Sequence, residues 1–152
     1  MRGFVREHAK GLNNLNKAGM IAILMSTYNG ERYLREQIDS LLSQTNKDWI
    51  LYIRDDGSTD GSGKICDEYA KTDNRITVIH QENHGISQVR NRGVKEARGT
   101  YIFWIDSDDY VSESIVEELY HNLIEQNAEM SICNYTPVSY THLRAHETSL
   151  HL

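Results

Sequence analysis

Short apolar runs alternate along this chain with longer segments whose apolar residues recur at helical spacing. The first pair sets the pattern, because residues 21–26 form an almost continuous apolar run and residues 31–44 place Leu34, Ile38 and Leu41 on one helical face. Consecutive parallel strands need a helical crossover of this kind, so the alternation predicts an α/β fold with a mostly parallel sheet. The other predicted strands are 49–53, 76–80, 100–105 and 130–134, and the other predicted helices are 61–71, 86–97 and 112–126.

Polar clusters follow three of the predicted strands at the point where each strand ends. They occupy residues 27–30, 55–58 and 106–109. The carboxyl ends of parallel strands meet at one edge of a sheet, and ligands of such sheets bind beyond that edge. We therefore expect the three clusters to form a single site.

The first cluster joins turn residues to an aromatic side chain. Residues 26–30 read Ser-Thr-Tyr-Asn-Gly. Gly30 permits a tight turn, and Tyr28 offers a flat face on which a base can stack. An ordinary strand-to-helix turn uses the same residue types, so this cluster by itself does not identify a binding site.

The second cluster contains paired aspartates at the end of a strand. Residues 56–61 match the first positions of a calcium loop, but a strand precedes them and the closing Glu of such a loop is replaced by Asp67. Ser58 or Asp60 is suited to capping the next helix. Capping leaves the adjacent pair Asp55 and Asp56 unexplained, so the pair indicates a binding role.

The third cluster places the carboxylates of Asp106, Asp108 and Asp109 within four residues. These carboxylates repel one another unless a cation or ample water surrounds them. A divalent metal shared with substrate phosphates would meet this need, although a solvated acidic turn would also do so. Phosphatases of the haloacid type also begin with two aspartates one residue apart, but Tyr110 stands where they normally have Thr or Val.

A fourth cluster, residues 84–93, places Arg90 near the start of a helix beside the acidic edge of the sheet. Its guanidinium can contact a base or a phosphate, or it can pair with one of the aspartates. The sequence leaves both alternatives open.

In this order, the four clusters resemble those of the family 2 (inverting) glycosyltransferases. The resemblance covers residues 21–134 and implies the GT-A fold, a Rossmann-like and mostly parallel sheet with flanking helices, here incomplete. It implies that Ser26, Tyr28, Asp56, Arg90 and Asp106 bind the nucleotide sugar, with Tyr28 stacking on uracil or thymine and Asp56 contacting the base. It also assigns Asp106 and Asp108 to the DXD metal motif, with Asp108 as the direct ligand. The matching stretches are STYNGERYLREQIDSLLSQT, RDDGSTDGS and GISQVRNRGVKEARGTYIFWIDSDD.

The resemblance implies transfer of a sugar from a UDP- or dTDP-linked donor to an acceptor hydroxyl, with inversion at the anomeric carbon. Mg²⁺ or Mn²⁺ would hold the diphosphate, and the acceptor would be a sugar or a lipid-linked sugar of a surface polysaccharide or glycolipid. The family's catalytic base belongs to an acceptor-binding half that we expect after residue 134. No residue is therefore assigned as the base, and we expect this chain to have little transferase activity. A non-catalytic nucleotide-sugar-binding module and a different α/β enzyme stay as alternatives.

The two ends of the chain differ in character from its centre. Residues 1–19 show no strong period, and we interpret Met20 as the natural start and residues 1–19 as a non-native extension, with a short N-terminal helix as the alternative. Residues 138–147 are the translation of GTCTCTTATACACATCTCCGAGCCCACGAG, which looks like the transposase-end adapter of sequencing libraries. We therefore interpret residues 137–152 as a non-native tail and residues 20–136 as the nucleotide-sugar-binding half.

Composition narrows the classes of partner. The formal net charge of −6 argues against a nucleic acid, since nucleic-acid-binding proteins usually carry a basic face. Cys66 and Cys133 show no metal-ligand spacing, and we expect two buried thiols in a reducing compartment. The longest apolar runs are far shorter than a membrane span. We expect a cytoplasmic location, at the inner face of the membrane where regions beyond this chain make contact with it.

Overall fold

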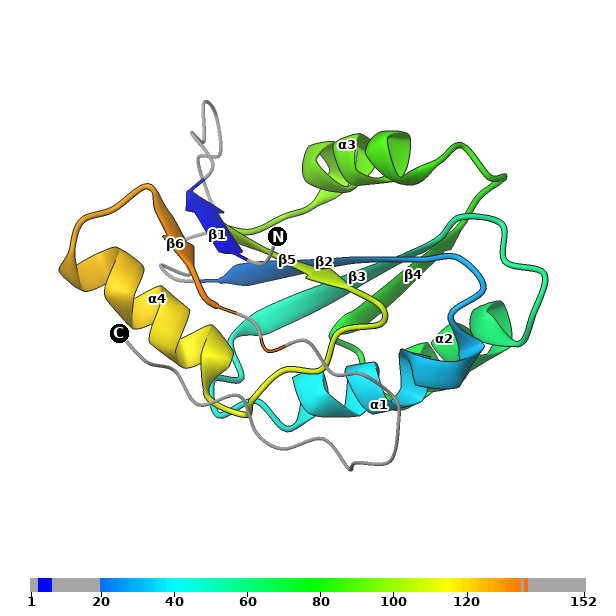
Figure 1. The fold of residues 1–152 in the computed structure, drawn as a ribbon, viewed down its shortest axis with the longest axis horizontal. Coiled ribbons are helices and arrows are strands. Elements are labelled where there is room, and N and C mark those ends of the chain that lie inside the picture. Colours follow the sequence, from blue (N-terminus) through cyan, green and yellow to red (C-terminus); the bar gives the residue numbers. More distant parts are fainter. Residues whose placement is uncertain (1–2, 7–19, 135, 137–152) are drawn as a thin grey trace.

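The computed structural model describes residues 3–6, 20–134 and 136, and it confirms the α/β class (Figure 1). Within these residues, six strands form one sheet in the order β4-β3-β2-β5-β1-β6. The four central strands β2 to β5 run parallel, while β1 pairs antiparallel with both β5 and β6. The strands are β1 (Gly3–Arg6), β2 (Ile21–Thr27), β3 (Trp49–Asp55), β4 (Ile76–His80), β5 (Tyr101–Asp106) and β6 (Met130–Ile132).

Helices cover both faces of the sheet. Figure 1 shows α3 on one face and α1 and α2 on the opposite face, with α4 beside the β1 and β6 edge. Right-handed crossovers put α1 and α2 on one face, since β2, β3 and β4 follow one another across the sheet, and put α3 on the other face, since the chain there returns past β3 and β2 to β5. The helices are α1 (Glu31–Leu42), α2 (Ser62–Thr72), α3 (Ile86–Glu96) and α4 (Ile115–Glu125). None of the helices in the described part of the chain has the length and apolar character needed to cross a bilayer.

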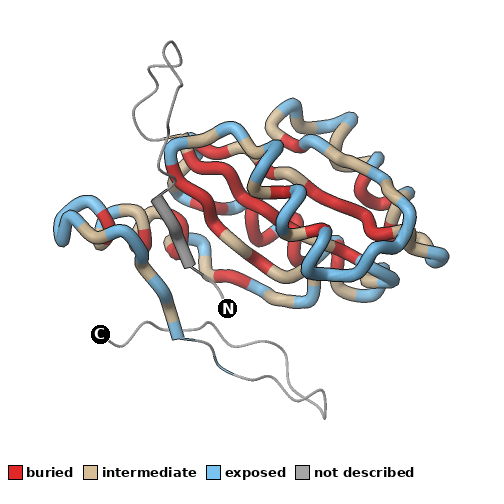
Figure 2. Tube along the Cα trace, turned by 90° about the horizontal axis from the view of Figure 1, so that it is seen from above, coloured by how far each residue is buried: buried red, intermediate tan, exposed pale blue. Residues whose placement is uncertain are grey.

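The main hydrophobic core lies between the sheet and the helices α1, α2 and α4. The central strands are buried almost throughout, which Figure 2 shows as a red interior beneath exposed helix surfaces. Alternate residues of β2 explain the pattern: Ile21, Ile23 and Met25 join this core, whereas Leu24 faces α3 at Gly93. Parallel strands covered on both faces are expected to be continuously apolar, as the sequence indicated.

The predicted elements are confirmed with shifts of a few residues at their ends, and three expectations need correction. The described part of the N-terminal segment is a strand, Gly3–Arg6, and not the short helix that was the alternative to a non-native extension. The fourth helix, predicted to start at residue 112, begins after Ser114, whose hydroxyl donates to Glu118 Oε1 at 2.5 Å. Cys66 is fully buried, but Cys133 is only half-buried. The interpretations of residues 7–19 and 137–152 concern parts of the chain outside the described residues.

A buried glutamine joins the end of α1 to the start of α4. Gln44 has no exposed surface, and its Nε2 donates to Ser40 O at 3.0 Å and to Ser112 O at 2.6 Å. Its Oε1 accepts the backbone N–H of Val116 at 3.1 Å. The sequence had placed this residue inside the first helix. Gln44 instead fixes the far end of the loop that follows β5, and that loop carries Asp108.

Candidate functional site

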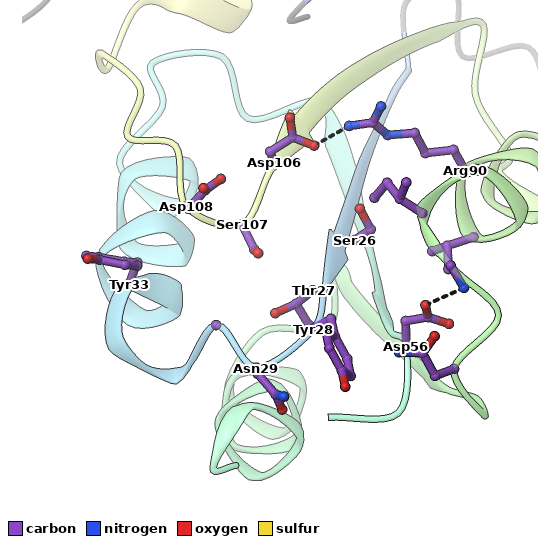
Figure 3. A pocket seen from close by; sticks show the side chains of 15 residues that line it. Ser26, Thr27, Tyr28, Asn29, Tyr33, Asp56, Arg90, Asp106, Ser107 and Asp108 are labelled. Carbon is purple, nitrogen blue, oxygen red and sulfur yellow. Dashed lines mark hydrogen bonds and ion pairs between the residues drawn. The ribbon is translucent and has the colours of Figure 1, made fainter. Parts of the chain in front are cut away.

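The loops that follow β2, β3 and β5 enclose an open pocket of about 560 Å³ at the carboxyl edge of the sheet. Figure 3 shows Tyr28 and Asp56 toward one end of this pocket and Asp106 and Asp108 toward the other. The helix α3 supplies the remaining wall. All six residues that the sequence assigned to binding or metal ligation line the pocket, namely Ser26, Tyr28, Asp56, Arg90, Asp106 and Asp108.

The turn after β2 exposes Tyr28 while it keeps the backbone tight. Asn29 adopts a left-handed conformation with φ of 51°, and Tyr28 has 54% of its surface exposed beside the pocket. A Cβ atom on Gly30 would lie 2.9 Å from Thr27 Oγ1 and 3.3 Å from Ser107 Oγ. Gly30 is therefore required because the loops after β2 and β5 approach each other here.

Reciprocal hydrogen bonds clasp the turn after β2 to the loop after β3. Asn29 N donates to Ser58 Oγ at 3.0 Å, and Asn29 Oδ1 accepts from Thr59 N at 2.8 Å. One turn further on, Glu31 N donates to Asp60 Oδ2 at 3.1 Å while Gly61 N donates to Glu31 Oε2 at 2.8 Å. The paired contacts hold Tyr28 and Asp56 on one rigid unit.

Of the two residues suggested as caps, Asp60 contacts the start of α2. Its Oδ1 accepts the N–H of Ser62, the first residue of the helix, at 2.9 Å. Ser58 instead accepts from the neighbouring turn, as described above. The acidic motif after β3 thus combines a helix contact, a loop clasp and a pocket carboxylate.

Asp56 is a buried carboxylate, 4% exposed, that receives three hydrogen bonds. Its Oδ1 accepts from Gln81 Nε2 at 2.8 Å and from His84 N at 3.0 Å, and its Oδ2 accepts from Gly85 N at 2.9 Å. Burial opposes ionisation, but these donors outweigh it and hold the pKa of Asp56 below its ordinary value. Asp56 is therefore an ionised acceptor that faces the pocket at neutral pH.

Asp55 points to the opposite face of the sheet and does not reach the pocket. Its Oδ1 accepts from Ser58 N at 3.0 Å, and its Oδ2 lies 2.9 Å from His80 Nδ1. His80 Nε2 lies 3.1 Å from Asp67 Oδ1, so hydrogen bonds to two carboxylates raise the pKa of His80. Burial raises the pKa of the adjacent Cys66 to about 12, which keeps this thiol protonated and unreactive. This group supports the loop after β3 from behind.

Arg90 pairs with the first aspartate of the acidic cluster. Its Nη2 lies 2.5 Å from Asp106 Oδ1, as drawn in Figure 3, and both side chains are partly exposed. The structure thus shows the ion-pair alternative for Arg90, at a position where the guanidinium also lines the pocket. Asp108 is exposed, and the turn that carries it is closed by a hydrogen bond from Asp109 N to Asp106 O at 3.1 Å.

The acidic end of the pocket offers hard oxygen donors but not a complete cage. Among the described residues, no group of three or more His, Cys, Asp and Glu side chains is arranged to hold a metal ion. Asp106 and Asp108 can supply one or two carboxylate oxygens, which is the usual protein share when Mg²⁺ or Mn²⁺ also binds phosphates and water. These donors fit a metal that arrives together with a phosphorylated ligand.

Sequence reasoning missed the residues that hold the pocket from behind. Gln81 and Gln44 are uncharged residues at strand and helix ends, where nothing in the spacing distinguishes them from solvated side chains. Asn29 carried a usable signal, because Asn adopts the left-handed backbone conformation more readily than most residue types other than glycine. The partner loop of that turn could not be read from the sequence.

Comparisons with known proteins agree with the observed fold and with the family resemblance. The model of Glycosyl transferase family 2 matches residues 22–150. Two glycosyltransferases of Streptococcus pneumoniae, GlyA and GlyG, are 42% and 43% identical to the chain over 115 and 117 residues, and each alignment covers 76% of the chain. A crystal structure of S. aureus TarS in complex with UDP-GlcNAc superposes with a TM-score of 0.65 at 27% identity, and the alignment covers 70% of this chain and 32% of that one.

The chain spans 16% of GlyA and 39% of GlyG, which is less than half the length of these relatives. The structural similarity to TarS confirms the GT-A fold over the 70% of this chain that the alignment covers. This chain belongs to glycosyl transferase family 2.

Proposed function

We propose that residues 20–136 form the donor-binding half of a glycosyltransferase that uses a UDP- or dTDP-linked sugar. One observation carries the proposal: the pocket joins an exposed aromatic ring beside an ionised acceptor to a second, acidic end. The first end, Tyr28 and Asp56, suits a base with a ring N–H, and the second, Asp106 and Asp108, suits a metal-bound diphosphate. TarS, whose structure contains UDP-GlcNAc, supports a nucleotide sugar as the ligand.

The residues divide the work of holding the donor. Tyr28 would stack against the base while Asp56 accepts its N–H, and Ser26 lies between them and the acidic end in Figure 3. Asp106 and Asp108 would hold Mg²⁺ or Mn²⁺, which supplies positive charge to the diphosphate leaving group. Arg90 would shift between Asp106 and a phosphate oxygen, since its guanidinium lines the pocket already.

We further propose that the parent enzyme transfers the sugar with inversion to a hydroxyl of a sugar or lipid-linked acceptor in a surface polymer. Inversion requires direct displacement by that hydroxyl, with a general base on the acceptor side. Among the described residues, the pocket carboxylates are already assigned to the nucleobase (Asp56) and to the metal ion (Asp106 and Asp108). We therefore expect the general base from a part of the enzyme that the family places after the donor-binding half.

Calorimetric titration of UDP into the chain, with and without Mn²⁺, tests the proposal. We expect Asp56→Ala to weaken UDP binding at least tenfold with or without metal, because it removes the acceptor for the base. Asp108→Asn should instead abolish the gain in affinity that Mn²⁺ provides. Asp109→Asn is the matched control, since it changes a neighbouring carboxylate that does not line the pocket. Binding of UDP by both pocket variants at wild-type affinity would refute the site assignment.

A further inference from the structure

Behind Asp56, side chains form an unbroken series of polar contacts that leads to the surface of α3. Arg54 is buried near the end of β3, with 5% of its surface exposed, and its guanidinium pairs with Glu96. Arg54 Nη1 also donates to Gln81 Oε1 at 3.1 Å. Gln81 Nε2 in turn donates to Asp56 Oδ1 at 2.8 Å. The Gln81 amide thus lies between a cation and an anion.

These two charges define one orientation of the Gln81 amide. A guanidinium can only donate, and an ionised carboxylate can only accept. If the amide turned over, its NH₂ group would face Arg54 and its oxygen would face Asp56, so both contacts would become repulsive. Arg54 therefore selects the rotamer in which Gln81 donates to Asp56.

The contact from Gln81 determines how many acceptor positions Asp56 keeps for a ligand. An ionised carboxylate has about four lone-pair positions. Gln81 Nε2 and His84 N occupy Oδ1, and Gly85 N occupies one position on Oδ2. One position on Oδ2 is left, and Asp56 lines the pocket. The Asp56 carboxylate can therefore accept one further hydrogen bond from an N–H group in the pocket.

We propose that Arg54 and Gln81 are positioning residues that keep the Asp56 carboxylate ionised and fix its orientation toward the pocket, with Arg54 acting through the Gln81 amide. The ligand of this inference, a nucleotide whose base offers a ring N–H, rests on the proposed function. Neither residue need touch that ligand. The series Glu96–Arg54–Gln81–Asp56 makes base recognition depend on a buried cation on the far side of the binding carboxylate.

Fold stability does not explain why this cation is buried here. The side chain of Arg54 is 6% exposed and that of Glu96 is 52% exposed, so the cost of desolvating the guanidinium is set against a carboxylate that water still screens. Arg54 is flanked by α3 at Gly93, where a Met side chain would fill the same space. The specific result of having Arg54 rather than Met is the donor contact to Gln81 Oε1.

The first experiment needs no nucleotide. The carboxyl carbon of Asp56 is followed by ¹³C NMR during a pH titration of the 152-residue chain. In Gln81→Met we expect the midpoint for Asp56 to rise by about one pH unit, the equivalent of one lost charge-assisted hydrogen bond. Arg54→Met should raise it by a smaller amount, because the freed amide then samples both orientations. Arg35→Met, which breaks an exposed ion pair with Glu68, is the matched control and should leave the midpoint unchanged.

The double variant distinguishes a relay from a long-range field. If Arg54 acts through Gln81, Arg54→Met has no further effect in the Gln81→Met background. An equal shift in both backgrounds, or no shift in either single variant, would overturn the proposal. Gln81→Asn controls for a fold disrupted by the apolar substitution, since it keeps an amide at this half-buried position. The shorter side chain cannot reach both Arg54 and Asp56. This variant should reproduce the Gln81→Met shift.

A second arm separates this inference from the proposed function. UDP and its N3-methyl analogue are titrated into wild type and Gln81→Met. We expect about tenfold weaker UDP binding in the variant, and weak binding of the analogue that does not change with the substitution. If wild type binds no UDP but the Asp56 midpoint moves as expected, the proposed function fails and the positioning role stands. If UDP binds but is insensitive to both substitutions, the positioning role fails.

Discussion

Replacing Gln44 by Leu tests whether the end of α1 holds the loop that follows β5. Gln44 is fully buried and joins three backbone groups in two elements that are far apart in sequence. Leu has a similar volume and no polar atoms, so the substitution removes the hydrogen bonds without opening a large cavity. The effect on stability then reports the value of the polar contacts.

The backbone N–H of Val116 determines the expected magnitude. It belongs to the first turn of α4, where no helical carbonyl is available, and Val116 has no exposed surface. Without Gln44 Oε1, this donor is left buried and unpaired, which costs about 1–3 kcal/mol. Ser112 O keeps its contact with Ile115 N, so its loss is smaller. We expect the free energy of unfolding to fall by about 2 kcal/mol in Gln44→Leu, and by about 3 kcal/mol in Gln44→Ala, which adds a cavity.

Urea unfolding followed by circular dichroism measures the difference. Helix α1, which ends just before Gln44, provides a matched control in Gln37, which is also buried but whose Nε2 finds no hydrogen-bond partner among the described residues. Gln37→Leu should therefore be neutral or stabilising. A change within about 0.5 kcal/mol of wild type for Gln44→Leu would refute the argument, since this is the range of ordinary surface substitutions. So would equal losses for the two glutamines.

Two further predictions concern the loop after β3. Gly57 adopts φ of 75°, and a Cβ atom there would lie 2.9 Å from Asn83 N. Gly57→Ala should therefore destabilise the fold by about 1–2 kcal/mol and weaken UDP binding. A variant that has the wild-type free energy of unfolding in urea and the wild-type UDP affinity by calorimetry would contradict this. His80→Phe removes both contacts to Asp55 and Asp67. Because the pKa of His80 is raised in the folded chain, its contribution is complete below about pH 6.5 and is lost as the pH rises through the folded pKa. The difference in unfolding free energy between wild type and variant should therefore shrink from pH 5.5 to pH 8.5, and a constant difference would contradict the ion pairing.

The sheet and its helices could be predicted because their signals are local and repeated. Buried parallel strands are apolar throughout, and each helix carries one apolar face, so residues 21–26 and 31–44 define elements without knowledge of their partners. Element ends were less accurate for a physical reason. Ser112 has the side chain of an N-cap, but the helix begins after Ser114 because Gln44 holds Ser112 O and Val116 N from outside the helix.

The sequence predicted those pocket residues that lie just after the parallel strands, but not the residues that support them. Tyr28, Asp56 and Asp108 are each the third residue after an apolar run, and the rule for parallel sheets places such residues at one edge. The supporting residues depend on contacts across 25 or more positions, as in the pairing of Gln81 with Asp56. A sequence specifies such a contact only through the packed fold, so no spacing rule could reveal it. The antiparallel strand Gly3–Arg6 was missed because four residues carry too little periodicity to be recognised.

The charge of the pocket explains why a metal and a nucleotide are expected to bind together. Among its described lining residues, three carboxylates (Asp56, Asp106 and Asp108) face one guanidinium (Arg90), a formal charge of −2. Asp56 is neutralised in part by backbone N–H groups and Gln81, and Arg90 is already paired with Asp106, so the uncompensated charge lies at Asp108. A diphosphate approaching that end without a cation would be repelled, whereas a uridine held at the far end would not. Under the proposed function, the base-binding end would be preorganised by the protein alone, while the phosphate-binding end would be completed only by an ion that arrives with the donor.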